Sequence, residues 1–476
     1  MVLLTAVSGC TAWAPSVPPS APTLLAIDVP AGWSAAEAAG AGTRGVGGES
    51  LVTWWQSFDD PLMADLVGRA LRSNTSVASA QAALRQAQGL RDVAAAALRP
   101  TLGGSASAQR GTAGGASTGN RFQLGLDAQW VPDVFGARRD ALDAGEAVAA
   151  ASAASLGDVQ VQVAASVASS YLLLRAVQAR RAIASDNLAN QQETWQITDW
   201  RQQAGLVTVL EVEQARAAAA QTQALLPVLQ TSIDQTLHAL AVLVGQPPAA
   251  LRTELGTVSN AMPDTLPIPR GDLVLMLDIP ADTLRQRADV QAAEYQVAAA
   301  LARVGQAEAQ RWPSFAIGGS LGWSAISMAA LTNGASVLGS LLASVRLPVF
   351  DGGTAHAQVQ VQQAALEQAQ QAYRAAVLGA LKDVENALVA LRGDRLRLAS
   401  LRMAADAAGN AARLARQRYS SGLVDFQTVL ETQRNQFATQ DGVVGARADL
   451  GNDQVRLFTA LGGGWRRVDA QQAAAR

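Results

Sequence analysis

The heptapeptide RQQAGLV at residues 201–207 recurs as RYSSGLV at residues 418–424, and both copies follow the pattern Arg-x-x-x-Gly-Leu-Val. The copies lie 217 residues apart, and three glycine pairs keep this separation: Gly136 and Gly353, Gly205 and Gly422, and Gly245 and Gly462. A separation of 213 residues relates Leu71, Val77 and Pro100 to Leu284, Val290 and Pro313. The chain of 476 residues is therefore an internal duplication, with repeat 1 over residues 51–245 and repeat 2 over residues 283–462.

Each repeat contains a stretch of 69 residues without proline, at 136–204 and at 353–421. A continuous helix of that length would be about 100 Å long, because an α-helix rises 1.5 Å per residue. In the second stretch the large apolar residues recur mostly at spacings of three and four: Tyr373, Val377, Leu381, Val384, Leu388, Leu391, Leu398 and Leu401. This spacing favours an extended, coiled-coil-like helical assembly over an ordinary buried helix face.

Four shorter segments alternate apolar with small or polar residues, and we predict strands at about 101–109, 121–130, 314–324 and 336–347. Four strands of about ten residues with one apolar face match the wall of a membrane β-barrel. Soluble antiparallel sheets alternate in the same way. Residues 312–345 carry no charge, which would also suit a transmembrane helix. Their period of two and their five glycines favour strands.

Four strands are too few to close a barrel, and an open sheet edge in lipid leaves backbone hydrogen-bonding groups without partners. The strand prediction therefore requires several copies of the chain. Two copies would supply eight strands, whose interior is nearly filled by side chains, and three would supply twelve, which leave a lumen. A conduit favours three copies.

The chain contains a single cysteine, Cys10, which ends the tetrapeptide VSGC at 7–10. This tetrapeptide resembles a bacterial lipobox, whose cysteine becomes the acylated first residue of the mature lipoprotein. The alternative is an ordinary free cysteine in a disordered leader. Residues 1–9 are short for the apolar part of a signal peptide and lack a basic segment, so we expect the signal peptide to begin upstream of Met1.

Three other segments lack the patterns of regular structure. Residues 11–50 are rich in Pro, Ala and Gly and predict a flexible tether. Residues 246–282 contain six prolines and predict an irregular connector between the repeats. Residues 463–476 predict a mobile tail.

Composition and spacing argue against several function classes. The net charge of -2 and the absence of a basic stripe argue against nucleic-acid binding. Gly318-x-Ser320-x-Gly322 fits the nucleophile-elbow pattern, but it lies inside an alternating run. The only histidines, His238 and His356, lie in helical stretches without metal-ligand spacing. We therefore predict no enzyme activity, no catalytic residue and no metal site.

Several segments, in order along residues from about 50 to 462, resemble TolC/OprM-type outer-membrane efflux lipoproteins of the NodT-like branch. They are Trp54 and Trp55 with Phe58, DPL at 60–62 with Leu66, Ala70, Leu71 and Asn74, WVPDVFG at 130–136, LRQRADV at 284–290 with Glu294, LPVFDGG at 347–353, YSSG at 419–422 and VLETQR at 429–434. The resemblance implies a mixed α and β membrane protein. Its trimer would combine a twelve-stranded transmembrane β-barrel, four strands per chain, with a periplasmic α-barrel of twelve long helices.

The resemblance also implies a function. The trimer would be the exit duct of a tripartite efflux system, passively conducting drugs or other small molecules that an inner-membrane pump, of RND type, and a periplasmic adaptor deliver. It would sit in the outer membrane among its lipids, extend into the periplasm, and carry diacylglycerol and N-acyl chains on Cys10 but no cofactor. A type I protein-secretion duct is one alternative. An elongated structural coiled-coil adaptor is another, which would explain the helices but not the strands.

Roles for the helix tips follow from the same resemblance. Glu211 and Tyr419 match a closing network between neighbouring helix pairs, and Glu431 matches an acidic residue that projects into the lumen near the periplasmic constriction. Three copies of Glu431 would form a carboxylate ring, which favours cations and binds multivalent ones. The usual arginine of the network would fall at Val424, so closure is expected to depend on packing and hydrogen bonds of Tyr419.

The two heptapeptide turns are the predicted docking tips for the adaptor. Gly205 and Gly422 suit the left-handed position that ends a helix, and Leu206 and Leu423 are available for hydrophobic contact. A generic helix end would explain the glycines, but not the arginine repeated at the same distance. The predicted docking residues are Arg201, Gly205, Leu206, Arg418, Gly422 and Leu423.

Overall fold

The computed structural model describes residues 30, 32–34, 51–111, 119–256, 284–332 and 337–466. Cys10, nearly all of the predicted tether, most of the proline-rich connector and most of the predicted tail lie outside these residues. None of the described helices combines the length and the apolar character that are needed to cross a membrane.

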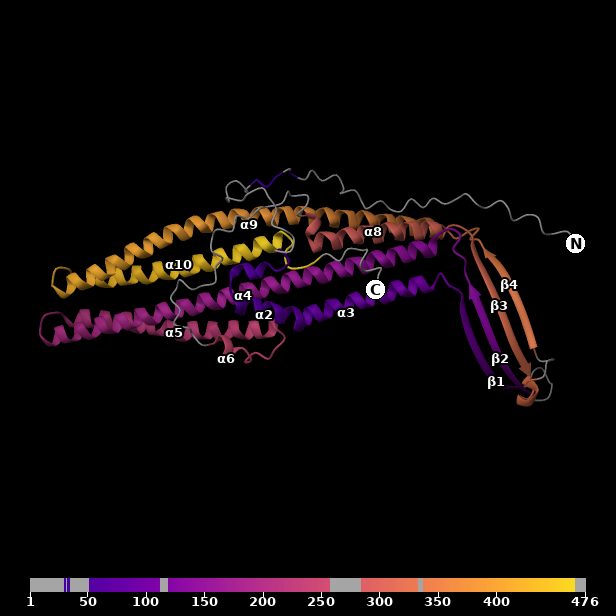
Figure 1. The fold of residues 1–476 in the computed structure, drawn as a ribbon, viewed down its shortest axis with the longest axis horizontal. Helices are drawn as coiled ribbons and strands as arrows, with labels where there is room; N and C mark the ends of the chain where they lie inside the picture. The colour runs from indigo at the N-terminus through magenta and orange to yellow at the C-terminus, as the bar shows by residue number, and fades with distance from the viewer. Residues whose placement is uncertain are drawn as a thin grey trace. The chain divides into compact units, whose positions relative to one another are not determined.

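The described helices and strands reproduce the duplication seen in the sequence (Figure 1). In repeat 1 they are the 3-10 helix η2 (Trp54–Phe58), then α2 (Pro61–Ser73), α3 (Thr75–Ala96), β1 (Thr101–Gly111), β2 (Gly119–Trp130), α4 (Ala137–Gln203) and α5 (Val209–Leu243). The short helix α6 (Arg252–Leu255) lies in the proline-rich connector, where the sequence predicts only irregular structure. In repeat 2 they are α8 (Ala288–Ala309), β3 (Ser314–Ala325), the 3-10 helix η4 (Met328–Thr332), β4 (Val337–Arg346), α9 (Thr354–Ser420) and α10 (Phe426–Ala460).

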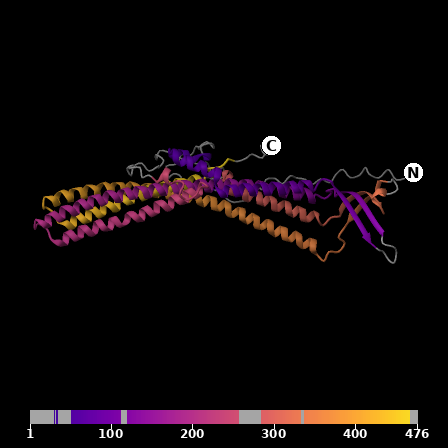
Figure 2. The same cartoon turned by 90° about the horizontal axis from the view of Figure 1, so that it is seen from below.

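The long helices of the two repeats have equal lengths. Helices α4 and α9 each contain 67 residues, and α5 and α10 each contain 35. Each long helix turns back into a shorter one, and the two hairpins, α4–α5 and α9–α10, are visible as separate pairs in Figure 1, whereas they overlap in the view of Figure 2. Each run of 67 residues corresponds to about 100 Å of helix.

The chain divides into two compact units that do not coincide with the repeats, because each unit takes segments from both. Among the described residues, unit 1 draws on the ranges 85–152 and 292–375, and it contains the four strands, the later parts of α3 and α8, and the first turns of α4 and α9. Unit 2 draws on 29–84, 153–291 and 376–476, and it contains the rest of both hairpins.

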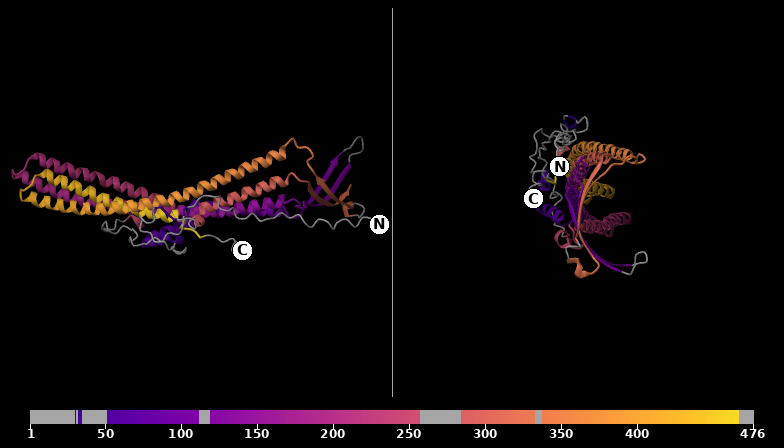
Figure 3. Two further views of the ribbon diagram at one scale, coloured as in Figure 1. Left: turned by 90° about the horizontal axis from the view of Figure 1, so that it is seen from above. Right: turned by 90° about the vertical axis from the view of Figure 1, so that its right-hand side faces the viewer.

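The strands of unit 1 form one antiparallel sheet in the order β1-β2-β3-β4 (Figure 3). The register places the large apolar residues of β2 and β3 on one face: Leu126 pairs with Leu321, which pairs with Gly339. On the other face Asp127 pairs with Ser320, whose hydroxyl oxygen lies 2.7 Å from that of Ser340. The predicted alternation is thereby confirmed, and the charge-free run over residues 312–345 contains strand β3 and most of strand β4 where a transmembrane helix was the alternative.

The core of unit 2 explains the aromatic and acidic residues near the start of repeat 1. Trp54 is 1% exposed, and its ring stacks on Phe458 of α10 with centroids 5.5 Å apart. Asp60 caps α2, because one carboxylate oxygen accepts hydrogen bonds from the backbone amides of Leu62 and Met63. Its other oxygen accepts a hydrogen bond of 2.7 Å from the hydroxyl of Tyr171 on α4. The start of repeat 1 is thus fastened to both hairpins.

Candidate functional site

The two heptapeptide turns end α4 and α9 in the same way. Gly205 and Gly422 have φ angles of 72° and 71°, in the left-handed region that glycine enters at little cost. Each glycine amide donates to the carbonyl oxygen three residues earlier, and the following leucine amide donates to the carbonyl oxygen of the repeated arginine, at 2.8 Å to 2.9 Å. This is a Schellman motif at both tips.

The leucines of these turns are largely exposed among the described residues. Leu206 is 70% exposed and Leu423 is 73% exposed. A Cβ atom added to Gly205 or Gly422 would meet no atom within 4 Å. The two tips are therefore exposed turns with an apolar side chain, and backbone hydrogen bonds rather than side-chain packing fix their conformation.

A cluster around Tyr419 joins the two hairpins just behind the tips. The Tyr419 side chain is buried, and its hydroxyl donates a hydrogen bond of 3.2 Å to a carboxylate oxygen of Glu211 on α5. The Arg201 guanidinium lies over the Tyr419 ring, 4.5 Å from its centroid, and donates to the Tyr419 backbone carbonyl at 3.0 Å. The ring of Phe426 packs beside the Tyr419 ring, with centroids 5.5 Å apart. Residues from α4, α5, α9 and α10 thus meet at one aromatic ring.

The electrostatics of this cluster keep Tyr419 neutral. Burial raises the pKa of Tyr419, and the nearby Glu211 carboxylate raises it further, whereas a hydrogen bond with Thr198 and the charge of Arg201 act in the opposite direction. The net pKa lies above the ordinary value, so the hydroxyl keeps its proton and remains a donor to Glu211.

The predicted site residues fall into three environments. Glu211 and Tyr419 lie together, as expected, and Arg201, which was predicted as a docking residue, lies with them. Val424, half-buried, packs against this cluster. Arg418 and Glu431 are exposed, and neither side chain has a hydrogen bond or ion pair within the described part of the chain.

Sequence reasoning missed the contact between Arg201 and Tyr419. The available signal was the departure from exact duplication: position 418 matches Arg201, but position 202, which matches Tyr419, is a glutamine. A tyrosine that occurs at only one of two equivalent tips marks a place where the hairpins differ in role.

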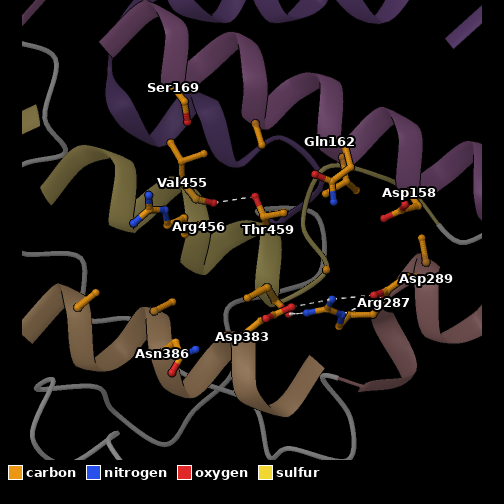
Figure 4. Close-up of a pocket in the computed structure, with 17 residues that line it drawn as sticks. Asp158, Gln162, Ser169, Arg287, Asp289, Asp383, Asn386, Val455, Arg456 and Thr459 are labelled. Carbon is orange, nitrogen blue, oxygen red and sulfur yellow. Dashed lines mark hydrogen bonds and ion pairs between the residues drawn. The ribbon is translucent and has the colours of Figure 1, made fainter. Parts of the chain in front are cut away.

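A second polar cluster lines a cavity of about 480 Å³ in unit 2, formed by α4, α9, α10 and the start of α8 (Figure 4). The Arg287 guanidinium donates to both carboxylate oxygens of Asp289, at 3.0 Å and 2.7 Å, and to the backbone carbonyl of Ala460 at 3.0 Å. Asp383 lies 3.5 Å from the same guanidinium. Burial alone would lower the pKa of Arg287, but Asp289 and Asp383 outweigh it and raise the pKa.

The carboxyl group of Asp158 faces this cavity from α4. Burial raises the pKa of Asp158, and the charge of Asp289 raises it further. The Arg287 guanidinium acts on Asp158, but it is already paired with Asp289 and Asp383. We therefore interpret this cluster as a structural contact that holds the start of α8 against the hairpins.

Known proteins match this chain along most of its length. The family model described as "Outer membrane efflux protein" matches residues 66–246 and 279–463, that is, each repeat once. The "Pyoverdine export outer membrane protein OpmQ" of Pseudomonas putida is 32% identical over 461 residues, which cover 94% of each chain. "Nodulation protein T" of Rhizobium leguminosarum bv. viciae is 30% identical over 423 residues, with 89% and 86% coverage.

A solved structure of the outer-membrane channel OprN has a TM-score of 0.82 to this chain. It is 32% identical, and the match covers 92% of this chain and 97% of that one. The match therefore includes both the strands and the hairpins.

Proposed function

The chain belongs to the outer membrane efflux protein family, and from this premise we propose that three copies form the exit duct of a tripartite efflux system. The family confirms the resemblance in the sequence: the protein is an outer-membrane efflux channel and not an enzyme. The finer proposal is a homotrimer that receives its cargo from an RND-type inner-membrane pump through a periplasmic adaptor. Because one relative is named for the export of pyoverdine, we propose small organic molecules as the cargo.

The observation that supports the proposed trimer is that the four-stranded sheet is open. Strands β1 and β4 are the two edges, and each has a neighbour on one side only within the described chain. The apolar face is exposed, with Leu341 84% accessible. In a membrane both edges need partners, since unpaired backbone groups cost several kcal/mol each in lipid. Pairing β4 of one copy with β1 of the next satisfies them, and three copies leave a lumen.

Cysteine pairs across this proposed seam test the assembly. In a Cys10→Ser background with a foreign signal peptide, Ser105→Cys in β1 is combined in turn with Ser340→Cys and Ser344→Cys in β4. All three serines lie on the polar face of the sheet. Oxidation is expected to yield a covalent trimer on denaturing gels, while each single cysteine stays monomeric. A ladder that stops at the dimer, or continues beyond the trimer, contradicts the proposal.

In the proposed duct, the cluster around Tyr419 holds the periplasmic end closed. The hydrogen bond of 3.2 Å to Glu211 and the stacked Arg201 support this role, because both fasten one hairpin to the other. Tyr419→Phe removes only the hydroxyl and is expected to raise channel conductance in planar bilayers. Unchanged conductance would assign the cluster to packing alone.

Three copies of Glu431 are proposed to line the constriction near this cluster. Its carboxylate is exposed on α10 and unpaired within the described residues, so it is free to bind ions. A trivalent cation added on the periplasmic side is expected to block the wild-type channel, and Glu431→Gln to relieve the block. Glu213→Gln, another exposed glutamate near the tips, is the control and should leave the block intact.

The lipid anchor is proposed at Cys10, which lies outside the described residues. Cys10→Ser is expected to abolish acyl labelling, while the same variant with a foreign signal peptide still forms membrane-inserted trimers. Labelling that persists in Cys10→Ser would place the lipid elsewhere.

A further inference from the structure

The strands and the segments that join them carry very few charged side chains. Over residues 101–130 and 314–346 the sequence contains only four: Arg110, Arg121, Asp127 and Arg346. All other residues of these two ranges are uncharged. Because so few charges are present, each one has a large influence on the electrostatic potential beside the sheet.

The register of β1 and β2 assigns three of these charges to the two faces of the sheet. Asp127 lies on the polar face, opposite Gly103 of β1, and Arg121 shares that face because it precedes Asp127 by six residues. Arg110 lies opposite Asn120, so it occupies the apolar face. Arg110 and Arg121 are therefore at the same end of the sheet but on opposite faces.

Arg346 lies at the other end of the polar face. It pairs with Ser314 at the start of β3, whereas Ser320, six residues later, pairs with Asp127. Arg121 and Arg346 are therefore each displaced from Asp127 by six residues, or about 20 Å along a strand, in opposite directions. Two arginines thus flank one carboxylate on the polar face.

The charges of Arg121, Asp127 and Arg346 are not compensated by neighbouring side chains. All three residues are exposed, and none of their side chains has a hydrogen bond or an ion pair within the described part of the chain. In the proposed trimer each of them becomes a ring of three. The rings would be about 15 Å apart along the axis of a barrel whose strands tilt by about 40°. This separation exceeds the Debye length of about 8 Å at physiological salt, so each ring acts separately on a solute.

We propose that the barrel section of the duct, the part formed by the strands, favours anionic small molecules. The rings of Arg121 and Arg346 set this preference, because rings of arginine or lysine side chains favour anions in pores. A solute that enters the barrel from either end meets a positive ring first. The ring of Asp127 between them weakens the binding of an anion, so that the anion can leave again.

This inference rests on the proposed function, because the polar face lines a lumen only if the sheet closes into a trimeric barrel. The preference is opposite in sign to that proposed for the ring of Glu431. The conductance of the whole channel would report both rings together, so the barrel section has to be probed locally.

The reactivity of single cysteines toward charged thiol reagents provides this local probe. In a Cys10→Ser background with a foreign signal peptide, Ser107→Cys is a diagonal neighbour of Arg121 on the polar face, and Ser344→Cys precedes Arg346 by two residues on that face. Trimers in phospholipid nanodiscs are treated with the anionic sulfonatoethyl and the cationic trimethylammonioethyl methanethiosulfonate. The ratio of the two rates is normalised to that of a free thiol in solution. Because both reagents attack the thiolate, a change in the pKa of the cysteine cancels in this ratio.

The anionic reagent is expected to react preferentially at both cysteines. Arg121→Gln should lower the ratio at Ser107→Cys about threefold or more, because the lost charge acts with opposite sign on the two reagents. Arg346→Gln should do the same at Ser344→Cys. Arg121→Lys keeps the charge and should keep the ratio, and salt of about 1 M should remove the preference.

The matched control is Arg110→Gln, which removes the same charge from the apolar face at the same end of the sheet. It should leave the ratio at Ser107→Cys unchanged. A decrease equal to that in Arg121→Gln would mean that the overall charge of the sheet, and not a ring in the lumen, attracts the reagent. That result would contradict the proposal.

Ala106→Cys separates a failure of this inference from a failure of the proposed barrel. Ala106 is adjacent to Ser107 but lies on the apolar face, opposite Leu124. If Ala106→Cys reacts as fast as Ser107→Cys, the polar face does not line a separate lumen and the proposed barrel is wrong. If only Ser107→Cys reacts and its ratio does not respond to Arg121→Gln, the barrel stands and the anion preference is wrong.

Discussion

The hairpins α4–α5 and α9–α10 have equal helix lengths and identical turn geometry, yet their polar residues differ where the structure is most specialised. Tyr419 corresponds to Gln202 in the first hairpin, and Glu211 corresponds to Thr428 in the second. The duplicated backbone supplies a scaffold in both halves. The hydrogen bond of the Tyr419 cluster joins two side chains, Tyr419 and Glu211, that each occur in one half only.

A pair of carboxyl groups, of which one is buried, shows the same divergence. Asp453 of α10 is 2% exposed, and it lies against Asp394 of α9. Burial and the hydrogen bond to Asp394 raise the pKa of Asp453 to about 6, although Arg456 lies 3.2 Å away. Asp449 adds a further negative charge, which Arg397 partly offsets at 2.9 Å. The equivalent positions in the first hairpin are Val177 and Thr236, which carry no charge.

The largest effect on stability is expected when the Asp453 carboxyl group, which the first hairpin lacks, is replaced. Because the folded pKa of Asp453 lies above its unfolded value of about 4, the folded state binds the proton more tightly. The contribution of Asp453 to stability is complete below about pH 4 and is lost as the pH rises through 6. At pH 7.5 Asp453→Asn is expected to raise the free energy of unfolding by about 1 to 3 kcal/mol. Thermal unfolding of trimers at pH 5 and pH 7.5 measures it.

The reciprocal change in the first hairpin is the control. Thr236→Asp buries a carboxylate where Val177 offers no proton-sharing partner, so it should destabilise the protein most at high pH. If Asp453→Asn keeps the wild-type dependence of the unfolding temperature on pH, Asp453 does not titrate in this range, and the two hairpins are electrostatically equivalent here.

Much of the fold was predictable because it is encoded in local periodicity. The period of two in residues 314–324 predicts a strand with one apolar face, and the proline-free stretches predict uninterrupted helices. Gly205 and Gly422 indicated left-handed turns for the same reason: only glycine enters that conformation without strain. These properties depend on neighbours in sequence.

The candidate site was only partly predictable because its contacts join distant segments. The contacts of Tyr419 with Arg201 and Glu211 require knowing which faces of α4, α5 and α9 turn toward one another. No spacing within one helix contains that information.

An intermediate effect on stability is expected from substitution of the two tip glycines, and its size should be the same in both hairpins. Gly205→Ala and Gly422→Ala each place a Cβ atom on a left-handed residue, which costs about 1 to 2 kcal/mol. No neighbouring atom lies within 4 Å, so backbone strain is the only cost and it should be equal at both tips. Denaturant unfolding of the two variants measures it.

Gly379→Ala, in the interior of α9 with open space around it, is the matched control and should be neutral or stabilising. In cells, cross-linking of the adaptor to Gly422→Val is expected to fall while the trimer still inserts. Normal cross-linking in that variant would separate the tips from adaptor docking. A cost at one tip alone would show that the turns are not equivalent.

The smallest effect is expected from substitution of the repeated arginine. Here the two hairpins should differ, because only one of the two substitutions should change the gating of the channel. Arg201 stacks on Tyr419 and donates to its backbone carbonyl, whereas Arg418 is exposed and unpaired within the described chain. Arg201→Gln removes a stacked cation worth about 1 kcal/mol, and it should therefore increase the open fraction of the channel about fivefold. Arg418→Gln removes the same charge from the equivalent position and should leave gating unchanged.

Single-channel recording of both variants decides between two explanations of the repeated arginine. If the arginine serves docking alone, both substitutions weaken adaptor cross-linking and neither alters conductance. If Arg201 has acquired a second role through Tyr419, its substitution alters conductance only while that ring is present. Arg201→Gln in a Tyr419→Leu background should then add nothing further, because the ring that the guanidinium covers is gone. Equal effects of Arg201→Gln with and without Tyr419 would contradict this coupling and return both arginines to a common role.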